Sequence, residues 1–147
     1  MGLQEKIEQN IVTALKSGES DTVQTLRMVI AAIKDEAIAK RKELSDEDVQ
    51  SIIQKEIKKR KESAEAFQKG GRKELADNEK AEADLLQQYL PEPLSEEELE
   101  KVIGEVIQKT GAESVKDMGK VMSQVMAKTQ GMAEGKQVSE KVRQLLS

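Results

Sequence analysis

The sequence contains no cysteine and no histidine among its 147 residues. Without cysteine the chain has no disulfide framework, no thiolate metal site and no cysteine nucleophile. Without histidine it also lacks the commonest general base and the commonest metal ligand. These two absences exclude every catalytic or metal site that is built on either residue.

Aromatic residues and long apolar runs are also scarce. The chain has one Phe, one Tyr and no Trp, so its core must consist of aliphatic side chains and methionine. No apolar run approaches the length that crosses a bilayer. The N-terminus is amphipathic and carries acidic residues, unlike a signal or transit peptide. We therefore expect a cytoplasmic protein without a membrane partner.

The apolar residues that are present recur at helical spacing, and no segment alternates as a half-buried strand does. Good helix formers dominate the composition. Both prolines, Pro91 and Pro93, follow the sequence Tyr89-Leu90 and disfavour helix at the residue before each of them. We predict an all-α protein with a four-helix N-terminal unit in residues 1–90 and a small three-helix C-terminal domain in residues 91–147.

Capping signals mark the expected helix ends. Ser20 is expected to cap the second helix and Ser45, followed by three acidic residues, the third. Ser95 with Glu98, and Ser114 with Asp117, have the spacing of capping boxes. Glycines are expected to end helices, or to begin the last one, at Gly18, Gly70, Gly111, Gly131 and Gly135. In the fourth helix, from about 72 to 89, we expect a buried stripe of Leu75, Leu85, Leu86 and Tyr89.

Two surface features have both a structural and a functional interpretation. Met118, Met122 and Met126 are spaced along one helix face and are either core filler or an adaptable groove for a protein partner. The basic runs 40–42 and 58–61 are either a solvated surface or a patch for an anionic partner. Successive helical residues point in different directions, so the acidic run 96–98 is expected to cap a helix and not to bind a metal.

Positive charge is concentrated at the C-terminal end. Although the net charge is −4, residues 115–147 carry six basic and three acidic side chains. The six cations line a predicted helical hairpin, whose turn offers backbone N–H groups that favour phosphate. No aromatic residue is available there to stack on a base, so a nucleic acid would be contacted through its backbone. The six are Lys116, Lys120, Lys128, Lys136, Lys141 and Arg143.

Catalytic motifs are missing from the sequence. It contains no glycine-rich phosphate loop, no nucleophile elbow and no recognisable pair of carboxylates. We predict no catalytic residue, no metal and no cofactor.

Five segments carry a resemblance to a known family, and together they extend over nearly the whole chain. They are RMVIAAIKDEAI, KEIKKRKESAEAFQKGGR, YLPEPLSEEEL, DMGKVMSQVM and GMAEGKQVSEKV. In their order and spacing the chain resembles the GatB/YqeY family. Its C-terminal part is similar to the tail of the B subunit of the amidotransferase that converts misacylated Glu-tRNA or Asp-tRNA.

The resemblance implies a two-part all-α architecture and a helical tail that contacts tRNA, without the catalytic body of that enzyme. The tail's turn typically reads Lys-Gly-Lys-Ala, whereas this chain has Gln130-Gly131-Met132-Ala133. The nearest cations are then Lys128 and Lys136. Our leading hypothesis is a non-catalytic module that recognises tRNA through Lys120, Lys128, Lys136 and Arg143. The alternatives are a helical protein-interaction adaptor, or an accessory to a carbon-nitrogen ligase that uses glutamine as amido donor.

Overall fold

The computed structural model describes residues 2–129 and 132–147, and within them the regular structure is helical, with no strand. The all-α prediction is confirmed. The chain forms two compact units, Met1–Leu90 and Pro91–Ser147. Gln130 and Gly131, in the predicted turn before the last helix, lie outside the described residues.

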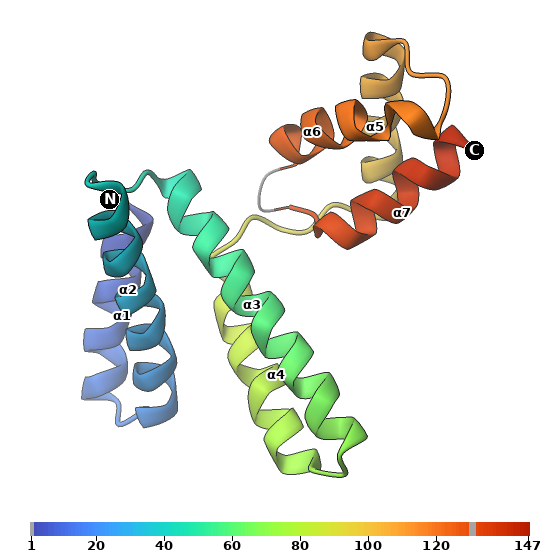
Figure 1. The fold of residues 1–147 in the computed structure, drawn as a ribbon. Coiled ribbons are helices and arrows are strands. Elements are labelled where there is room, and N and C mark those ends of the chain that lie inside the picture. Colours follow the sequence, from blue (N-terminus) through green and yellow to red (C-terminus); the bar gives the residue numbers. More distant parts are fainter. Residues whose placement is uncertain (1, 130–131) are drawn as a thin grey trace. The chain divides into compact units, whose positions relative to one another are not determined.

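The first unit is made of two helical hairpins (Figure 1). The first hairpin joins α1 (Leu3–Lys16) to α2 (Ser20–Lys40), and the second joins α3 (Asp46–Lys69) to α4 (Lys73–Gln87). All four helices contribute to one aliphatic core, whose fully buried members include Ile7, Leu26, Ile33, Ile53 and Leu86. The spacing of these residues gives each helix an apolar stripe, and the burial of the stripes holds the hairpins together.

Local signals determine the ends of α3. The Ser45 hydroxyl accepts a hydrogen bond from the Asp48 N–H, and the Asp48 carboxylate accepts one from the Ser45 N–H, which completes a capping box. The helix ends at Lys69, immediately before Gly70.

Two expectations for the first unit are wrong. Ser20 is the first helical residue and not the cap, and Leu75 is exposed because the buried positions of α4 are Ala76, Ala83 and Leu86.

The second unit contains α5 (Glu96–Thr110), a 3-10 turn η1 (Val115–Asp117), α6 (Met118–Lys128) and α7 (Gly135–Leu146). Its core includes Leu99, Ile103, Val121, Val125, Val138 and Val142. The Leu94 N–H also donates to the Met132 carbonyl at 2.8 Å, which ties the segment before α5 to the segment before α7.

Some of the helix ends predicted for the second unit are confirmed and others differ from the prediction. Ser95 accepts from the Glu98 N–H as expected, and Gly111 adopts a positive φ of 70° after α5. The Ser114–Asp117 capping box also forms, but it caps η1 and not a continuous α-helix. In addition, α6 ends at Lys128, earlier than the expected glycine. The Ser114 hydroxyl accepts from the Lys116 N–H, two residues on, whereas Ser45 and Ser95 accept from the N–H three residues on. The same serine and acidic residues at the same spacing therefore occur at both kinds of helix start, and the sequence signal does not distinguish them.

Candidate functional site

The four cations of the predicted nucleic-acid site are all exposed. Lys120 and Lys128 lie on α6 eight residues apart, with Gln124 midway between them, so they follow one stripe of that helix. Lys136 and Arg143 are seven residues apart and share a stripe of α7. None of the four forms an ion pair with any residue that the structure describes. Their charges are therefore available to an anion.

Lys141 differs from these four cations. Its Nζ lies 2.8 Å from Glu100 Oε1 and its side chain is only 18% exposed. The hydrogen bond to Glu100 raises the pKa of Lys141 above its ordinary value of 10.5. This ion pair connects α7 to α5, so Lys141 acts in the packing of the second unit. Lys141 differs from the exposed cations of α7 because Glu100 lies beside it on a neighbouring helix.

Lys136 has the most distinctive position of the four exposed cations. It lies in the first turn of α7, whose N-cap residue, Glu134, makes no capping hydrogen bond with its side chain. The first backbone N–H groups of a helix have no partner within it, and the helix dipole is positive at this end. A lysine here adds a second positive charge where the helix itself prefers a negative one. Helix and side chain together favour an anion such as phosphate.

The methionine stripe is neither fully exposed nor fully buried. Met118, Met122 and Met126 are half-buried and pack against the core of the second unit. The residues of α6 that point to the centre of the core are Val121 and Val125, which are fully buried. The three thioethers flank this valine pair and do not form an open groove of their own.

Several cations of the basic runs in the first unit form ion pairs. Lys40 lies 3.5 Å from Glu36, and Lys42 lies 3.9 Å from Asp48. Arg60, which the sequence places in a basic run, turns inward and is only 5% exposed. The pattern Glu56–Arg60 is visible in the sequence as an i, i+4 pair, but the burial of the pair is not.

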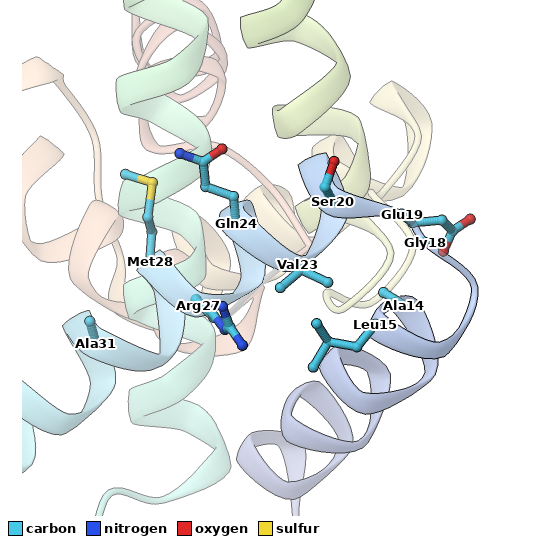
Figure 2. A pocket seen from close by; sticks show the side chains of 10 residues that line it. All are labelled: Ala14, Leu15, Gly18, Glu19, Ser20, Val23, Gln24, Arg27, Met28 and Ala31. Atoms are coloured by element: carbon cyan, nitrogen blue, oxygen red, sulfur yellow. The ribbon is translucent and has the colours of Figure 1, made fainter.

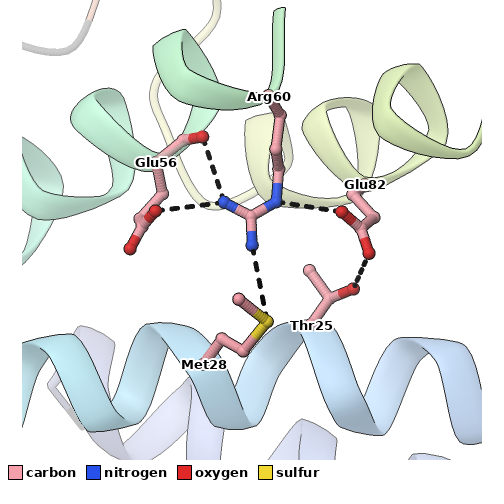
Figure 3. Close-up of polar contacts among 5 residues, drawn as sticks. All are labelled: Thr25, Met28, Glu56, Arg60 and Glu82. Carbon is pink, nitrogen blue, oxygen red and sulfur yellow. Dashed lines mark hydrogen bonds and ion pairs between the residues drawn. The ribbon is translucent and has the colours of Figure 1, made fainter. Parts of the chain in front are cut away.

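Arg60 is the centre of a polar network that joins α2, α3 and α4 (Figure 3). Its Nη1 donates to the backbone oxygen and to Oε2 of Glu56, both at 3.1 Å. Its Nε lies 3.3 Å from Glu82 Oε2 without the alignment of a hydrogen bond, so this contact is an ion pair only. The Thr25 hydroxyl donates to the other oxygen of Glu82 at 3.2 Å. The fourth contact of Arg60 is from Nη2 to Met28 Sδ, at 3.9 Å.

An open, mainly apolar groove of about 610 Å³ lies along α1 and α2 (Figure 2). Leu15 of α1 and Met28 of α2 line it and are 52% and 53% exposed. Glu19 and Arg27 also line it. Met28 therefore belongs both to the groove and to the Arg60 network. No residue pattern predicts this groove, because it depends on how α1 packs on α2.

No helix among the described residues is long and apolar enough to cross a membrane. No three potential metal-ligating side chains in the described ranges lie close enough together to hold an ion. The acidic run at the start of α5 follows Ser95, as the first turn of a capped helix.

Comparison with known proteins identifies the family. The model of the Yqey-like protein family matches residues 4–146, nearly the whole chain. The chain belongs to this family. One relative, an uncharacterized protein of Schizosaccharomyces pombe, is 33% identical over 93 residues, which cover 63% of this chain and 76% of the relative. Another is a Pyrenophora tritici-repentis protein named altered inheritance of mitochondria protein 41, mitochondrial. It is 26% identical over 144 residues, which cover 96% of this chain and 79% of the relative.

Proposed function

We propose that this Yqey-like protein is a non-catalytic helical module that binds tRNA through Lys120, Lys128, Lys136 and Arg143. The observation that carries the proposal is the position of Lys136 in the first turn of α7, where the lysine adds its charge to the positive end of the helix dipole. The exposure of the other three cations supports it. The resemblance of this unit to the tail of a tRNA-dependent amidotransferase subunit supplies the class of ligand.

The aromatic residues limit how RNA is recognised. Tyr89 is 6% exposed and its hydroxyl is bonded to Asn10, while Phe67 is half-buried. Both belong to the first unit and not to the unit that carries the four cations, and the buried Tyr89 presents no open face on which a base could stack. RNA would then be recognised through contacts to its phosphates and through its folded shape. Binding should therefore depend strongly on salt concentration.

The test is a titration of the purified protein with tRNA at several salt concentrations, with duplex DNA as competitor. A variant with alanine at Lys120, Lys128, Lys136 and Arg143 is compared with a control of equal charge, with alanine at Lys6, Lys16, Lys34 and Arg72. We expect the first variant to lose binding and each lost phosphate contact to reduce the slope of log K against log salt by about 0.7–0.9. Equal losses in both variants, or equal affinity for DNA, would reduce the interaction to general charge attraction.

A catalytic accessory role has only the family resemblance in its favour. It predicts that the protein changes the turnover of a glutamine-dependent amidotransferase on misacylated tRNA. For the isolated protein with glutamine, ATP and misacylated tRNA, we expect no turnover. The adaptor alternative would use the methionine stripe of α6 or a helical groove, and the half-burial of the three methionines leaves only part of a free face on α6. Absence of tRNA binding at low salt would favour the adaptor.

A further inference from the structure

Met28 connects solvent to a buried charge. The residue is 53% exposed and lines the groove along α1 and α2 (Figure 2), while its sulfur lies 3.9 Å from Nη2 of the buried Arg60 (Figure 3). The other methionines that the structure describes, Met118, Met122, Met126 and Met132, are half-buried. A small oxidant in water can therefore reach Met28 more readily than any of these four.

The guanidinium of Arg60 is incompletely satisfied. It has five N–H donors, and a buried cation is stable only when such donors meet acceptors. The two on Nη1 are bonded to Glu56, but Nε has no aligned acceptor. For Nη2 the contact among the described residues is the thioether, which is a weak acceptor. Among the described residues, Nη2 therefore has a sulfur contact and no oxygen acceptor.

We propose that Met28 is an oxidation site for hydrogen peroxide and that Arg60 holds the resulting sulfoxide. A lone pair of Sδ attacks one peroxide oxygen, so that an S–O bond forms and the O–O bond breaks. The hydroxide that leaves takes the proton from the transferred oxygen and becomes water. Sulfur is oxidised by two electrons and the peroxide is reduced by two. The groove is open and Met28 is 53% exposed in it, so the peroxide needs no rearrangement of the helices.

The sulfoxide oxygen carries partial negative charge. It is bonded to the sulfur atom that lies 3.9 Å from Nη2. It can accept a charge-assisted hydrogen bond, which is shorter and stronger than the contact to a thioether. Oxidation of a methionine in a core usually disrupts packing, because a polar group enters apolar surroundings. Here the polar group meets a donor, and the first unit should become more stable. The oxidation of Met28 and the contact of its sulfoxide with Arg60 do not depend on RNA binding.

The first experiment treats the protein with limiting hydrogen peroxide and maps the product by peptide mass spectrometry. We expect Met28 to be modified before the four half-buried methionines. The singly oxidised protein should then unfold at a temperature about 4 °C higher, a shift typical of one moderate interaction in a domain of this size. Met28→Leu under the same treatment should show no rise. Slower modification of Met28, or a fall in unfolding temperature for the wild type, would overturn the proposal.

A second pair of variants tests the acceptor without any oxidant. Met28→Gln places a side-chain carbonyl near Nη2, whereas Met28→Leu places a methyl group there. We expect the glutamine variant to unfold at the higher temperature, although leucine is more apolar and a slightly better helix former. In an Arg60→Lys background this order should reverse, because the lysine does not present the same fork of donors. If Met28→Leu unfolds at a higher temperature than Met28→Gln with Arg60 intact, an oxygen near the guanidinium does not stabilise the fold and the proposal fails.

Discussion

The side-chain amide of Asn10 donates a 2.6 Å hydrogen bond to the hydroxyl of Tyr89, which lies 79 positions further along the chain. The bond joins α1 to the segment that follows α4, the last residues of the first unit. Tyr89 is also the only aromatic member of the first core. The single tyrosine of the sequence therefore closes this unit between its first helix and its end.

The Asn10–Tyr89 bond should be measurable in a double-mutant cycle. Tyr89→Phe keeps the ring in the core and removes the acceptor, so we expect a loss of about 1 kcal/mol in the free energy of unfolding. In an Asn10→Ala background the same substitution should cost much less. Chemical denaturation of the four proteins gives the coupling energy. A coupling near zero would mean that water replaces the bond without loss.

Arg60 should be far more sensitive to substitution than its neighbours in the basic run. Arg60→Met leaves Glu56 and Glu82 without their cation in a site where the arginine side chain is 6% exposed. We expect a loss of about 3–5 kcal/mol, the cost of breaking a buried ion pair by removing one partner. Lys59→Met changes the adjacent exposed residue of α3 and should cost less than about 0.5 kcal/mol. Similar urea midpoints for the two variants would contradict the inward position of Arg60.

Within this network, Glu56 should matter more than Glu82. Glu56 accepts an aligned hydrogen bond from Arg60 and its side chain is 13% exposed, whereas Glu82 is 35% exposed and contacts Arg60 only through the ion pair to Nε. Glu56→Gln should therefore reduce the free energy of unfolding more than Glu82→Gln. The same urea series decides between them, and the reverse order would show that Glu82 is the main counterion.

The capping box at the start of α3 gives the first unit a defined response to acid. The hydrogen bond from the Ser45 N–H is the main cause that lowers the pKa of Asp48 below its ordinary value of 3.8. A carboxyl whose pKa is lower in the folded state stabilises the fold above the unfolded pKa. This contribution is therefore present above about pH 3.8 and is lost as the pH falls through the folded value.

Asp48→Asn should remove this part of the pH dependence. Glu47→Gln, which changes the same charge in the same helical turn, should leave it in place, because Glu47 is exposed and outside the capping box. Thermal unfolding of both variants between pH 2 and pH 6 provides the comparison. Parallel curves for Asp48→Asn and the wild type would exclude the capping carboxylate as the acid-sensitive group.

The sequence was most informative where a few adjacent residues determine the structure. The Ser45 box, the end of α3 at Gly70 and the end of α5 at Gly111 need only a side chain and the backbone of one turn. Hydrophobic spacing also identified Leu86 and Tyr89 as members of the first core, with Leu85 packed against it. It failed for Leu75, because both Leu75 and the adjacent Ala76 are compatible with an apolar stripe, and packing of α4 on α3 selected the alanine.

Features that depend on several helices could not be predicted. Arg60 belongs to a basic run by sequence, yet it is buried in contact with Glu56 of α3, Glu82 of α4 and Met28 of α2. The C-terminal cations are equivalent by composition, but Glu100 on α5 pairs with Lys141 and leaves Arg143 exposed. The partner of Lys141 and the residues of α2 and α4 that contact Arg60 come from other helices, and neither spacing nor charge count contains that information.

Lys141 and Lys136, five residues apart on α7, should respond to alanine in opposite ways. Lys141 stabilises the second unit through Glu100. Its pKa is raised, so this contribution is complete below about pH 10.5 and is lost as the pH rises through the folded value. Lys141→Ala should therefore speed hydrogen exchange of the α7 amides at neutral pH and leave the salt slope of tRNA binding unchanged.

Lys136 opposes the dipole of the helix that carries it. Lys136→Ala should stabilise α7 by about 0.3 kcal/mol and slow the exchange of its amides. The same change should weaken tRNA binding and reduce the salt slope by about 0.7–0.9, because a phosphate contact is lost. A gain in stability together with a loss of affinity is the signature of a residue kept for a ligand at the cost of the fold. If Lys136→Ala left tRNA binding intact, the start of α7 would not be the phosphate site, and the other three cations would have to account for any affinity.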